Sequence, residues 1–435
     1  MKRISVIGMG FVGLVSAACF AHKGFDVIAS THDPKKVELI KEGKAPFYEK
    51  DLTPILVGAV KKGNLRVMVG RKEAILDSDI TFIAVGTPSK ADGSIDLGFI
   101  KSSAKEIGEA LKDKDGHLVV VKSTVAPGTT EEIVKPVIEK HSGKKIGSDF
   151  GLCMSPEFLR EGNAVYDTLH PDRIVIGESD KSAGDALEEF YREFYGEKCS
   201  PILRMSLVAA EMVKYASNAL LSTKISFANE IGNICKEFGI DAYEVMRAVG
   251  MDHRLSPHFL RAGVGFGGSC FPKDVKALIH KAKDIGYDPK LLKAVMNVNE
   301  EQPKRMIKLL ERKLPSLKGK KVAVLGLAFK NDTDDIRESR AIPIIKMLMD
   351  KNVRVSVYDP LANENMRSIF PDPDIEYCTS AEESLRNADA CLVVTEWDEF
   401  KKLDHEFDVM KNRIIIDGRK VISPREGIDY EGLCW

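Results

Sequence analysis

The apolar positions of the first two hundred residues fall in short continuous runs separated by helix-like stretches. The runs cover residues 3–8, 26–30, 79–85, 117–123 and 173–177, and turn-forming residues bound them. Unbroken apolar runs of this length are typical of parallel strands that are buried on both faces. Because helical patterns alternate with them, the runs predict a doubly wound α/β sheet.

The pattern changes at about Ser206, where a much longer segment begins. SLVAAEMVKYASNALLSTKISFANEIGNICKEFG contains no proline, and its first glycine is Gly232. Apolar side chains would occupy most of the circumference of a helix here, and such a helix is normally buried between larger bodies. At roughly 30 residues it would extend about 45 Å, enough to join two domains and to carry a subunit interface.

A second series of strand-like runs follows residues 315–319. It contains KKVAVLGLAFK, RVSVYDP, ACLVVT and RIIIDG, and its opening repeats the start of the chain, with basic residues, a short apolar run and then glycine. We therefore expect an α/β protein with two Rossmann-like domains joined by a central helical region that contains one long helix. The expected boundaries are 1–204, 205–315 and 316–435.

Composition and charge narrow the class of protein. Hydrophobic residues make up 44% of the chain and charged residues 30%, and 64 Lys and Arg nearly balance 65 Asp and Glu. This balance argues against a general binder of nucleic acid or of anionic membranes, and no apolar run approaches membrane-spanning length. We find no signal-peptide pattern in the glycine-broken start. The eight scattered cysteines form no CxxC pair, so we expect no metal site, no disulfide framework and a cytoplasmic location.

The first glycine cluster has the spacing of a dinucleotide-binding turn. VIGMGFVG places Gly8, Gly10 and Gly13 in a G-x-G-x-x-G pattern between a predicted strand and a helix. In such a turn the first glycine forms the bend, the second lets a pyrophosphate approach the backbone, and the third allows close helix–strand packing. The helix N-terminus supplies N–H groups to the phosphates. In this βαβ context the pattern favours a dinucleotide site over a merely structural turn.

The carboxylate that usually accompanies this turn is missing. Such domains commonly carry an acid at the end of the second strand, where it binds the adenosine ribose, but VIASTHDPKK places Thr31 there. Asp33 precedes a proline and is better explained as a helix N-cap. Without the strand-end carboxylate a 2′-phosphate is not repelled, and Ser30, Thr31, His32 and Lys36 can bind one. NAD and NADP are therefore expected equally as cofactors.

A single cysteine lies among glycines in GVGFGGSCFPKD. Cys270 comes just before a predicted helix with Pro272 as its expected first residue, and Lys273 lies close by. A helix N-terminus and a nearby cation both lower the pKa of a thiol, and glycines let backbone and substrate approach closely. The other cysteines are better explained as small buried hydrophobes. Cys270 is therefore the candidate nucleophile.

Polar residues form a stripe along the long central helix. They recur at helical spacing at Glu211, Lys214, Asn218 and Ser222. On a mostly apolar helix this stripe favours a polar ligand as its partner. In CMSPEFLREG, Glu157 and Glu161 follow the C-terminal end of a strand, where α/β proteins collect their site residues; loop solvation or helix capping is the alternative for both.

Taken together and in order, these segments resemble the UDP-glucose/GDP-mannose dehydrogenase family. The resemblance covers essentially the whole chain and rests on VIGMGFVGL, VGTP, KSTVAPGTT, SPEFLREG, EMVKYASNALLSTKISFANEI, GVGFGGSCFPKD and VLGLAFKNDTDDIRES. It implies an NAD(P)-dependent oxidoreductase that oxidises UDP-glucose at C6 to UDP-glucuronate, with four electrons and two cofactor molecules per turnover. It also implies a homodimer with a nucleotide-sugar substrate, the dinucleotide in the N-terminal domain and the nucleotide half of the sugar in the C-terminal domain.

The resemblance also implies roles for individual residues. The catalytic residues would be Cys270, Lys214, Asn218, Thr124, Glu157 and Asp274. With the glycine turn and the strand end included, the cofactor contacts would be Gly8, Gly10, Phe11, Val12, Gly13, Thr31, Lys36, Thr87, Thr124, Lys273 and Arg337. The substrate contacts would be Phe158, Leu159, Arg160, Glu161, Lys214, Asn218, Arg254, Phe259, Gly263, Phe329, Lys330 and Arg419. Arg254 would come from the neighbouring subunit, and a domain-interface ion pair is the alternative for Arg337.

The implied reaction explains why a thiol is needed. The first oxidation yields an aldehyde, which can lose a second hydride only after a nucleophile adds to its carbonyl. Cys270 would add to give a thiohemiacetal, whose oxidation gives a thioester that water hydrolyses. Lys214 and Asn218 would stabilise the oxyanions, and either Glu157 or Asp274 would be the base that activates water. Stabilisation of the first helical turn is the competing explanation for Asp274.

Departures from the family pattern leave alternatives open. Thr31 stands where an aspartate is usual, and Ala126 and Pro127 change the loop after the KST motif. Another UDP-hexose or a GDP-mannose 6-dehydrogenase would share the catalytic residues. A two-electron dehydrogenase of the hydroxyacid type would need no nucleophilic cysteine and would yield one reduced cofactor per substrate. The complete set of candidate catalytic residues argues against a non-catalytic nucleotide-sugar sensor.

Overall fold

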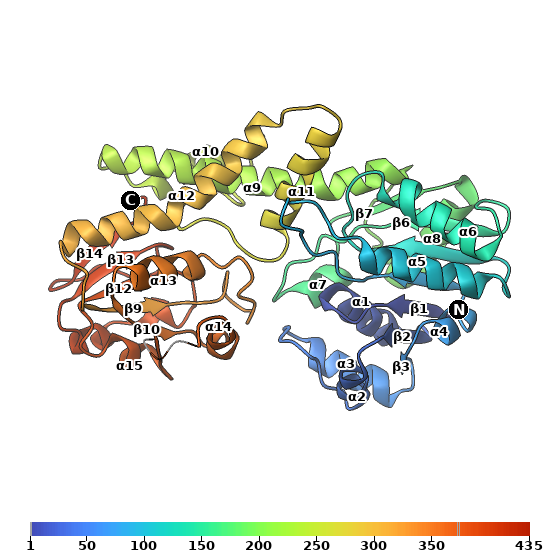
Figure 1. Ribbon diagram of the computed structural model, residues 1–435, viewed down its shortest axis with the longest axis horizontal. Coiled ribbons are helices and arrows are strands. Elements are labelled where there is room, and N and C mark those ends of the chain that lie inside the picture. The colour runs from blue at the N-terminus through green and yellow to red at the C-terminus, as the bar shows by residue number, and fades with distance from the viewer. Residues whose placement is uncertain (1, 372, 374) are drawn as a thin grey trace. The chain divides into compact units, whose positions relative to one another are not determined.

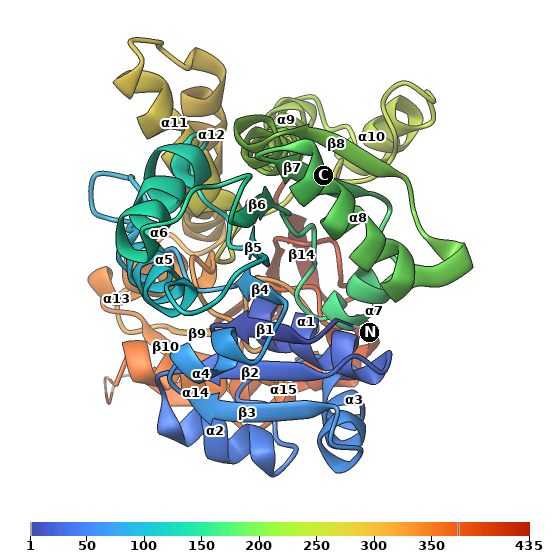
Figure 2. The same cartoon turned by 90° about the vertical axis from the view of Figure 1, so that its right-hand side faces the viewer.

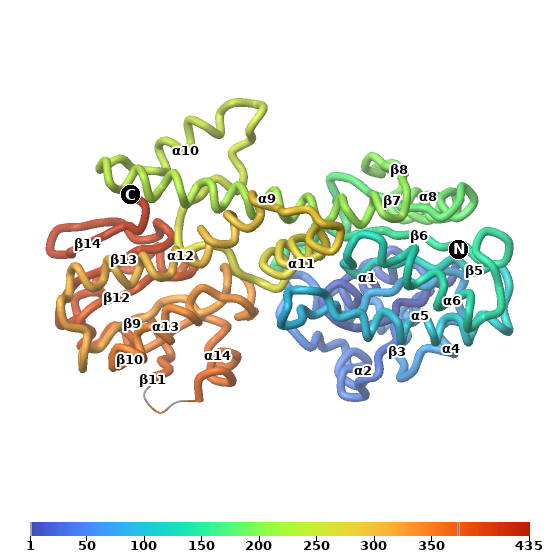
Figure 3. Tube along the Cα trace, turned by 45° about the horizontal axis from the view of Figure 1, so that its top comes forward, coloured from blue at the N-terminus to red at the C-terminus, as the bar shows by residue number. Residues whose placement is uncertain are grey.

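The computed structural model describes residues 2–371, 373 and 375–435. The chain divides into two compact units, of which the first ends at Ser217 and the second begins at Asn218 (Figure 1). The division falls inside helix α9 (Leu207–Glu237), a helix of 31 residues that Figure 3 traces as one uninterrupted segment. The long helix predicted from the apolar pattern is confirmed. Among the described residues, no helix has the length and apolar character needed to cross a membrane.

The first unit is an α/β sheet buried on both faces. Its strands are β1 (Ile4–Ile7), β2 (Val27–Thr31), β3 (Leu65–Val69), β4 (Ile80–Ile83), β5 (His117–Val121), β6 (Phe150–Met154), β7 (Ile174–Glu178) and β8 (Ile202–Ser206). Its helices are α1 (Phe11–His22), α2 (Pro34–Lys41), α3 (Leu52–Lys61), α4 (Lys72–Leu76), α5 (Gly98–Leu111), η1 (Thr130–Val134), α6 (Lys135–Ser142), α7 (Ala164–Leu169), α8 (Lys181–Tyr195) and η2 (Gly196–Lys198). Side chains of α1, α3 and α8 pack on one face, and those of α5 and α6 pack on the other.

The strand order of this sheet defines where a ligand would bind. The order is β3-β2-β1-β4-β5-β6-β7-β8, and the strands from β3 to β6 are parallel (Figure 2). The direction of winding reverses between β1 and β4, because the chain first adds strands on one side of β1 and then on the other. In open α/β sheets ligands bind at the carboxyl ends of the strands beside such a reversal. The turns that follow β1, β2, β4, β5 and β6 all lie at this edge.

One predicted strand has the wrong direction. Residues 173–177 were expected to be parallel to their neighbours, but β7 is antiparallel to β6, with Met154 opposite Gly177. The six-residue helix α7 rises about 9 Å, less than the roughly 16 Å length of a five-residue strand. This helix does not return the chain across the sheet, and β7 starts at the edge where β6 ends. The 15-residue helix α8 is long enough to cross, and β8 is parallel to β7.

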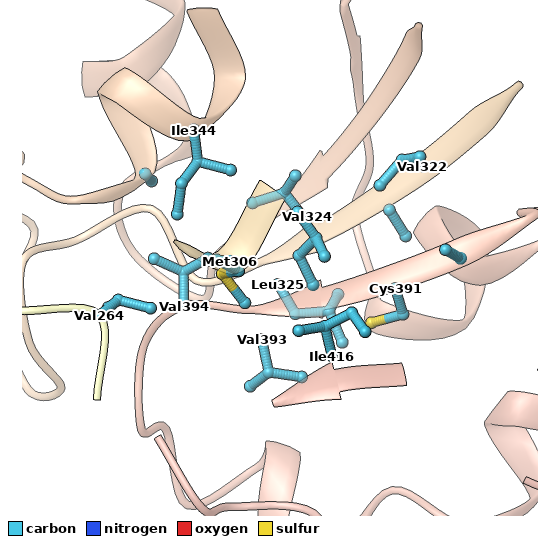
Figure 4. Packing of buried hydrophobic residues seen from close by; sticks show 14 of the residues in the cluster. Val264, Met306, Val322, Val324, Leu325, Ile344, Cys391, Val393, Val394 and Ile416 are labelled. Carbon is cyan, nitrogen blue, oxygen red and sulfur yellow. The ribbon is translucent and has the colours of Figure 1, made fainter. Parts of the chain in front are cut away.

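The second unit contains a fully parallel sheet and the remaining helices. Its strands are β9 (Lys321–Leu325), β10 (Arg354–Tyr358), β11 (Ile375–Tyr377), β12 (Ala390–Val393), β13 (Ile414–Asp417) and β14 (Asp429–Gly432), in the order β11-β10-β9-β12-β13-β14. Its helices after α9 are α10 (Ala242–Gly250), α11 (Phe271–Asp284), α12 (Lys290–Lys313), α13 (Ala341–Asp350), α14 (Asn363–Ile369), α15 (Ala381–Leu385), η3 (Phe400–Lys402) and η4 (His405–Val409). The apolar core of this unit includes Val264, which comes from the segment before Cys270 and packs with Met306 and Val394 among the strand residues (Figure 4).

Candidate active site

The glycine turn after β1 has the geometry of a phosphate cradle. Gly8 has φ +98°, and a Cβ atom there would lie 2.7 Å from the carbonyl oxygen of Ala84, while a Cβ on Gly13 would collide with the carbonyl of Gly8. The fold itself therefore needs both of these glycines. Gly10 differs, because a Cβ there would meet nothing within 4 Å, and no side chain caps the N-terminus of α1 at this residue. The open space and uncapped N–H groups fit the pyrophosphate of a dinucleotide.

At the end of β2 the structure confirms that Asp33 is a helix cap. Its Oδ1 accepts hydrogen bonds from the N–H groups of Lys35 at 3.0 Å and Lys36 at 3.4 Å at the start of α2. The side chain of Thr31, which ends β2, accepts from the N–H of Asp33 at 3.3 Å. The carboxylate of Asp33 is therefore committed to the helix, and the strand ends in a hydroxyl group.

The loops after β4 and β5 are joined beside this turn. The hydroxyl of Thr87 donates to the carbonyl oxygen of Thr124 at 2.8 Å, and the hydroxyl of Ser123 donates to that of Val85 at 2.8 Å. The two candidate threonines thus contact each other at the edge of the sheet where the direction of winding reverses. The sequence motifs identified both threonines but gave no sign that they contact each other.

Glu157 and Lys214 form a buried ion pair in the first unit. Lys214 Nζ lies 3.0 Å from Glu157 Oε1, and both side chains are almost fully buried. Glu157 Oε2 also accepts from the N–H of Leu159 at 2.6 Å. Burial acts to raise the pKa of Glu157, but the charge of Lys214 and these hydrogen bonds outweigh it, so the pKa lies below the ordinary value. The arrangement holds Glu157 as a carboxylate beside Lys214.

The FLRE segment and the residues after it are held partly by residues that the sequence did not single out, namely Arg173, Asp167 and Glu49. The guanidinium of Arg173 lies 4.0 Å from the ring centre of Phe158, and Lys214 Nζ lies 5.6 Å from the same ring. Arg160 binds Asp167 through two nitrogens at 3.0 and 2.6 Å. Buried Glu49 accepts from the N–H groups of residues 162 and 164 at 2.7 and 2.8 Å. A lone glutamate more than a hundred residues away carries no sequence signal for this contact.

Glu211 connects the long helix to the loop after Thr124. It is fully buried one turn before Lys214, and its two oxygens accept from the N–H groups of Gly128 at 2.6 Å and Thr130 at 2.7 Å. Burial raises the pKa of Glu211 to about 7 despite these bonds. Glu211 belongs to the polar stripe predicted along the helix, but its carboxylate binds the backbone N–H groups of a loop.

In the second unit, three buried amides hold the segment before Cys270. Asn229 Oδ1 accepts from the N–H of Gly263 at 2.7 Å, and Gln302 Nε2 donates to the carbonyl of Gly263 at 2.8 Å. Asn299 binds both the N–H of Phe266, at 2.7 Å, and its carbonyl, at 3.0 Å. These amides come from α9 and α12, so the segment is fixed on both sides. Sequence reasoning missed all three, and polar residues on otherwise apolar helix faces were the available signal.

The glycines of this segment are required by close backbone approach. Gly265 has φ +97°, and a Cβ there would lie 2.5 Å from Asn299 Oδ1. Gly268 has φ +82°, and a Cβ there would lie 2.7 Å from the ring of Phe329. The expected substrate residues Gly263 and Phe329 therefore also shape the loop. An L-residue at either positive-φ site would combine backbone strain with a collision.

Cys270 is the N-cap of α11, which begins at Phe271, so the helix starts one residue earlier than predicted and Pro272 is its second residue. Its Sγ lies 3.5 Å from Ser269 Oγ. One turn into the helix, buried Asp274 accepts from Asn218 Nδ2 and Lys273 Nζ, each at 2.6 Å. The structure thus brings three expected catalytic or cofactor residues together at the start of the cysteine helix.

The second Rossmann-like sheet has an internal carboxylate in place of a phosphate. After β9, the N–H groups of Leu327 and Ala328 donate to Asp359 Oδ2 at 2.7 and 3.0 Å, and Trp397 Nε1 donates to the same oxygen at 3.0 Å. Asp359 is buried at the end of β10. Because these N–H groups are already occupied, the turn does not fit a dinucleotide as the first turn does.

The arginines of the second unit that were expected to contact the substrate or the cofactor have different surroundings. Arg419, after β13, donates from Nε to the carbonyl of Val394 at 2.8 Å and from Nη2 to the carbonyl of Gly265 at 3.1 Å, so it reaches the cysteine loop. Arg337 accepts at its carbonyl from the N–H of Gly268 at 2.9 Å, while its guanidinium binds Asp335. Arg254 is exposed and pairs with the carboxylate two residues before it. Of the other expected contacts, Lys330 donates to its neighbour's carbonyl and Phe259 has φ +64°.

Family models and known proteins match this chain along most of its length. Family models of the UDP-glucose/GDP-mannose dehydrogenase family match residues 2–195 with the NAD-binding domain, 208–301 with the central domain and 323–424 with the UDP-binding domain. The chain is 50% identical over 433 residues to UDP-glucose 6-dehydrogenase AglM of Haloferax volcanii, covering 99% of this chain and 100% of that protein. It is 44% identical over 360 residues to a GDP-mannose 6-dehydrogenase of Pseudomonas aeruginosa, covering 82% and 81%. A solved UDP-glucose dehydrogenase of Pyrobaculum islandicum matches with a TM-score of 0.94 and 42% identity, over 100% of this chain and 98% of that one.

Proposed function

This chain belongs to the UDP-glucose/GDP-mannose dehydrogenase family, and on that premise we propose that it oxidises UDP-glucose at C6 to UDP-glucuronate through a covalent bond to Cys270. The observation that carries the proposal is the start of α11, where Cys270 occupies the N-cap position and Asp274, one turn further on, binds Asn218. A two-step oxidation that passes through an aldehyde needs a positioned nucleophile of this kind.

The residues divide the chemistry according to their charge. The bound dinucleotide supplies the acceptor for the hydride that leaves C6 in each oxidation. Cys270 adds to the aldehyde to give a thiohemiacetal, and the later thioester is hydrolysed by water. Lys214 carries the positive charge suited to an alkoxide or tetrahedral oxyanion, and Asn218, one helical turn further on, donates to the same oxygen.

Two carboxylates, Glu157 and Asp274, are candidates for the base that activates water. Each carboxylate binds one cationic side chain and one N–H donor: Glu157 binds Lys214 and a backbone N–H, and Asp274 binds Lys273 and the amide of Asn218. Of the two, Glu157 is the one next to the segment expected to line the sugar site. We therefore assign proton transfer from water to Glu157, with Thr124 orienting that water, and a positioning role to Asp274. The expected substrate segment, residues 158–161, follows Glu157 directly.

Within the family, the next question is which nucleotide sugar this chain oxidises. The matched UDP-glucose 6-dehydrogenase is 50% identical over the full length of that protein, against 44% over 81% of the GDP-mannose enzyme. This difference favours UDP-glucose, and GDP-mannose is the second candidate. The hydroxyacid-type alternative lacks support, because the three matched family domains account for the cysteine helix as well as the glycine turn.

The test is to measure reduced cofactor and acid product with UDP-glucose and GDP-mannose as substrates. We expect two reduced cofactors per UDP-glucuronate, and we expect Cys270→Ser to lose acid formation while still binding NAD. Cys378→Ser, a buried cysteine of the C-terminal sheet region, is the matched control and should keep activity. One reduced cofactor per substrate, or full acid production by Cys270→Ser, would reject the proposal.

The cofactor site supports NAD, and we propose that NADP is also accepted. The first unit contains the matched NAD-binding domain. The strand-end hydroxyl of Thr31 and the commitment of Asp33 to α2 leave no carboxylate of β2 to repel a 2′-phosphate. We keep the three-part division at 1–204, 205–315 and 316–435 as a proposal, with the dinucleotide in the first part, the nucleophile in the second and the nucleotide sugar in the third.

The outer face of α9 supports a homodimer. Leu220, Phe227 and Ile234 recur every seven residues and are 63%, 47% and 50% exposed. Seven-residue apolar repeats on a helix are typical of a helix–helix seam, and we propose a second copy of this chain as the partner. Arg254 is proposed to reach the neighbouring subunit's substrate. All eight cysteines are free, which supports a cytoplasmic location.

A further inference from the structure

The ends of β2 and β3 meet at the corner of the first sheet where the adenosine half of a dinucleotide is expected. Thr31, the last residue of β2, is paired with Val69, the last residue of β3. The N–H of Gly70 donates to the carbonyl of Thr31 at 3.3 Å. Arg71 therefore follows directly after the backbone contact with Thr31.

Arg71 is buried at this corner with an unused donor. Its side chain is only 5% exposed, and Nη1 donates to Glu106 Oε1 at 2.8 Å and to Ser102 Oγ at 3.4 Å, both on α5. Its Nε is buried and has no hydrogen-bond partner among the residues that the structure describes. A buried donor without an acceptor is costly. This cost points to an acceptor that binds here from outside the chain.

Other basic side chains flank the same position. His32, which follows Thr31, has its Nε2 3.5 Å from Glu106 Oε1, so that carboxylate is shared by His32 and Arg71. Lys36 lies in the first turn of α2. The carboxylate nearest in sequence, Asp33, points to the N–H groups of α2. Glu106 is therefore the carboxylate that binds this group of basic side chains.

We propose that Arg71, with His32 and Lys36, forms a subsite for the 2′-phosphate of NADP at the end of β2. The subsite rests on the proposed function, since it concerns the dinucleotide of that reaction. A phosphomonoester has several acceptor oxygens, and guanidinium groups bind such oxygens through parallel N–H donors. Thr31 contributes a hydroxyl and no charge. Glu106 holds Arg71 in place and opposes the phosphate by its charge, so the balance between them sets the preference for NADP over NAD.

The experiment is calorimetric titration of the full chain with NAD and with NADP, separately and without UDP-glucose. For the unaltered protein we expect measurable binding of both. Arg71→Ala should raise the ratio of the NADP dissociation constant to the NAD dissociation constant about tenfold or more, because a charge-assisted bond is lost. Thr31→Asp should raise the same ratio by charge repulsion, and Glu106→Gln should lower it.

The matched control is Arg66→Ala on β3. Arg66 is half-exposed and lies 3.4 Å from Asp26, so its removal should leave the ratio unchanged. NAD binding by Arg71→Ala shows that the variant is folded, and if that variant does not fold, Thr31→Asp decides the question. Failure of the unaltered protein to bind NADP, or a ratio unchanged by both substitutions, overturns the subsite.

Turnover separates this inference from the proposed function. Oxidation of UDP-glucose with NAD by a protein that does not bind NADP would reject the subsite and leave the function standing. NADP binding that depends on Arg71, without oxidation of UDP-glucose, would support the subsite and reject the function.

Discussion

Two buried glutamates show how the partner of a carboxylate decides its charge. Glu157 and Glu211 are both nearly inaccessible to solvent. Glu157 faces an ammonium group, and its pKa is lowered, whereas Glu211 accepts hydrogen bonds from backbone N–H groups, and burial raises its pKa to about 7. A full opposite charge thus outweighs the effect of burial on the pKa of a carboxyl group, whereas the backbone hydrogen bonds of Glu211 do not. This difference separates a residue suited to chemistry from one suited to positioning a loop.

The buried pair Glu157–Lys214 predicts a specific pattern of stability. Lys214→Met should lower stability by about 3–5 kcal/mol, since it leaves an uncompensated buried carboxylate. The double variant Lys214→Met with Glu157→Gln should be more stable than Lys214→Met alone, because the unpaired charge is gone. Thermal unfolding midpoints of the three proteins measure this order. A double variant that is less stable than the single one would contradict the ion pair.

Glu211 predicts a pH dependence with a definite sign. Its pKa rises from an ordinary value of 4.5 to about 7 on folding, so the folded protein holds a proton that the unfolded chain has released. Its contribution to stability should therefore fall as pH rises from about 4.5 to about 7. Glu211→Gln should flatten this part of the profile of unfolding midpoint against pH, and Glu237→Gln, at the exposed end of the same helix, should not. If Glu211→Gln and the unaltered protein had equal slopes of unfolding midpoint against pH, a raised pKa of Glu211 would be contradicted.

At the scale of elements, two glycine turns perform opposite tasks. The turn after β1 keeps space open at Gly10, while the segment before Cys270 uses its glycines to bring backbones into contact. Amides from α9 and α12 then fix that segment at the start of α11. A rigid, fully bonded loop positions a nucleophile more accurately than a mobile one.

The open space at Gly10 predicts a variant that binds cofactor poorly but folds normally. Gly10→Ala places a methyl group where the chain has no atoms within 4 Å, so the unfolding midpoint should stay within a degree or so of the original. The KM for NAD should rise about tenfold or more, because the methyl group occupies the path of the pyrophosphate. Steady-state kinetics and a thermal scan measure the two effects. An unchanged KM would show that no phosphate approaches this residue.

The cysteine segment predicts the reverse combination. Gly265→Ala adds backbone strain of about 1–2 kcal/mol and a collision with Asn299. The control Gly239→Ala has a similar φ of +68° but open space around the new methyl group. We expect Gly265→Ala to lower the unfolding midpoint more than Gly239→Ala and to lower kcat. Equal losses of stability would mean that strain alone, and not close packing, selects glycine at residue 265.

At the scale of the whole molecule, the chain uses the Rossmann-like pattern twice with different outcomes. In the first unit the N–H groups after β1 have no side-chain cap, and in the second the equivalent groups bind Asp359. A carboxylate from the chain thus replaces a phosphate from a ligand. The order and parallel direction of the first six strands are shared by the two sheets, but among the described residues only in the second do the N–H groups of this turn bind a carboxylate of the chain.

The exposed seam of α9 predicts the oligomeric state. We expect the protein to sediment as a dimer, and Phe227→Glu to shift it toward the monomer, because a charge on an apolar seam must be desolvated. Ile369→Glu, at an exposed apolar residue of α14, is the control and should remain dimeric. Analytical ultracentrifugation distinguishes the two species. A Phe227→Glu variant that stays dimeric would place the interface elsewhere.

The sequence by itself determined the fold class, the long helix, the cap at Asp33 and the candidates Cys270, Lys214 and Glu157. These depend on local periodicity, on turn chemistry and on motifs whose members are close together in the chain. Tertiary structure decided the antiparallel direction of β7, the contacts of Glu49, Asn299 and Arg71, and the opposite directions of the pKa shifts of Glu157 and Glu211. Each of these depends on a partner far away in the sequence, and side-chain burial and pKa are set by three-dimensional surroundings that local pattern does not contain.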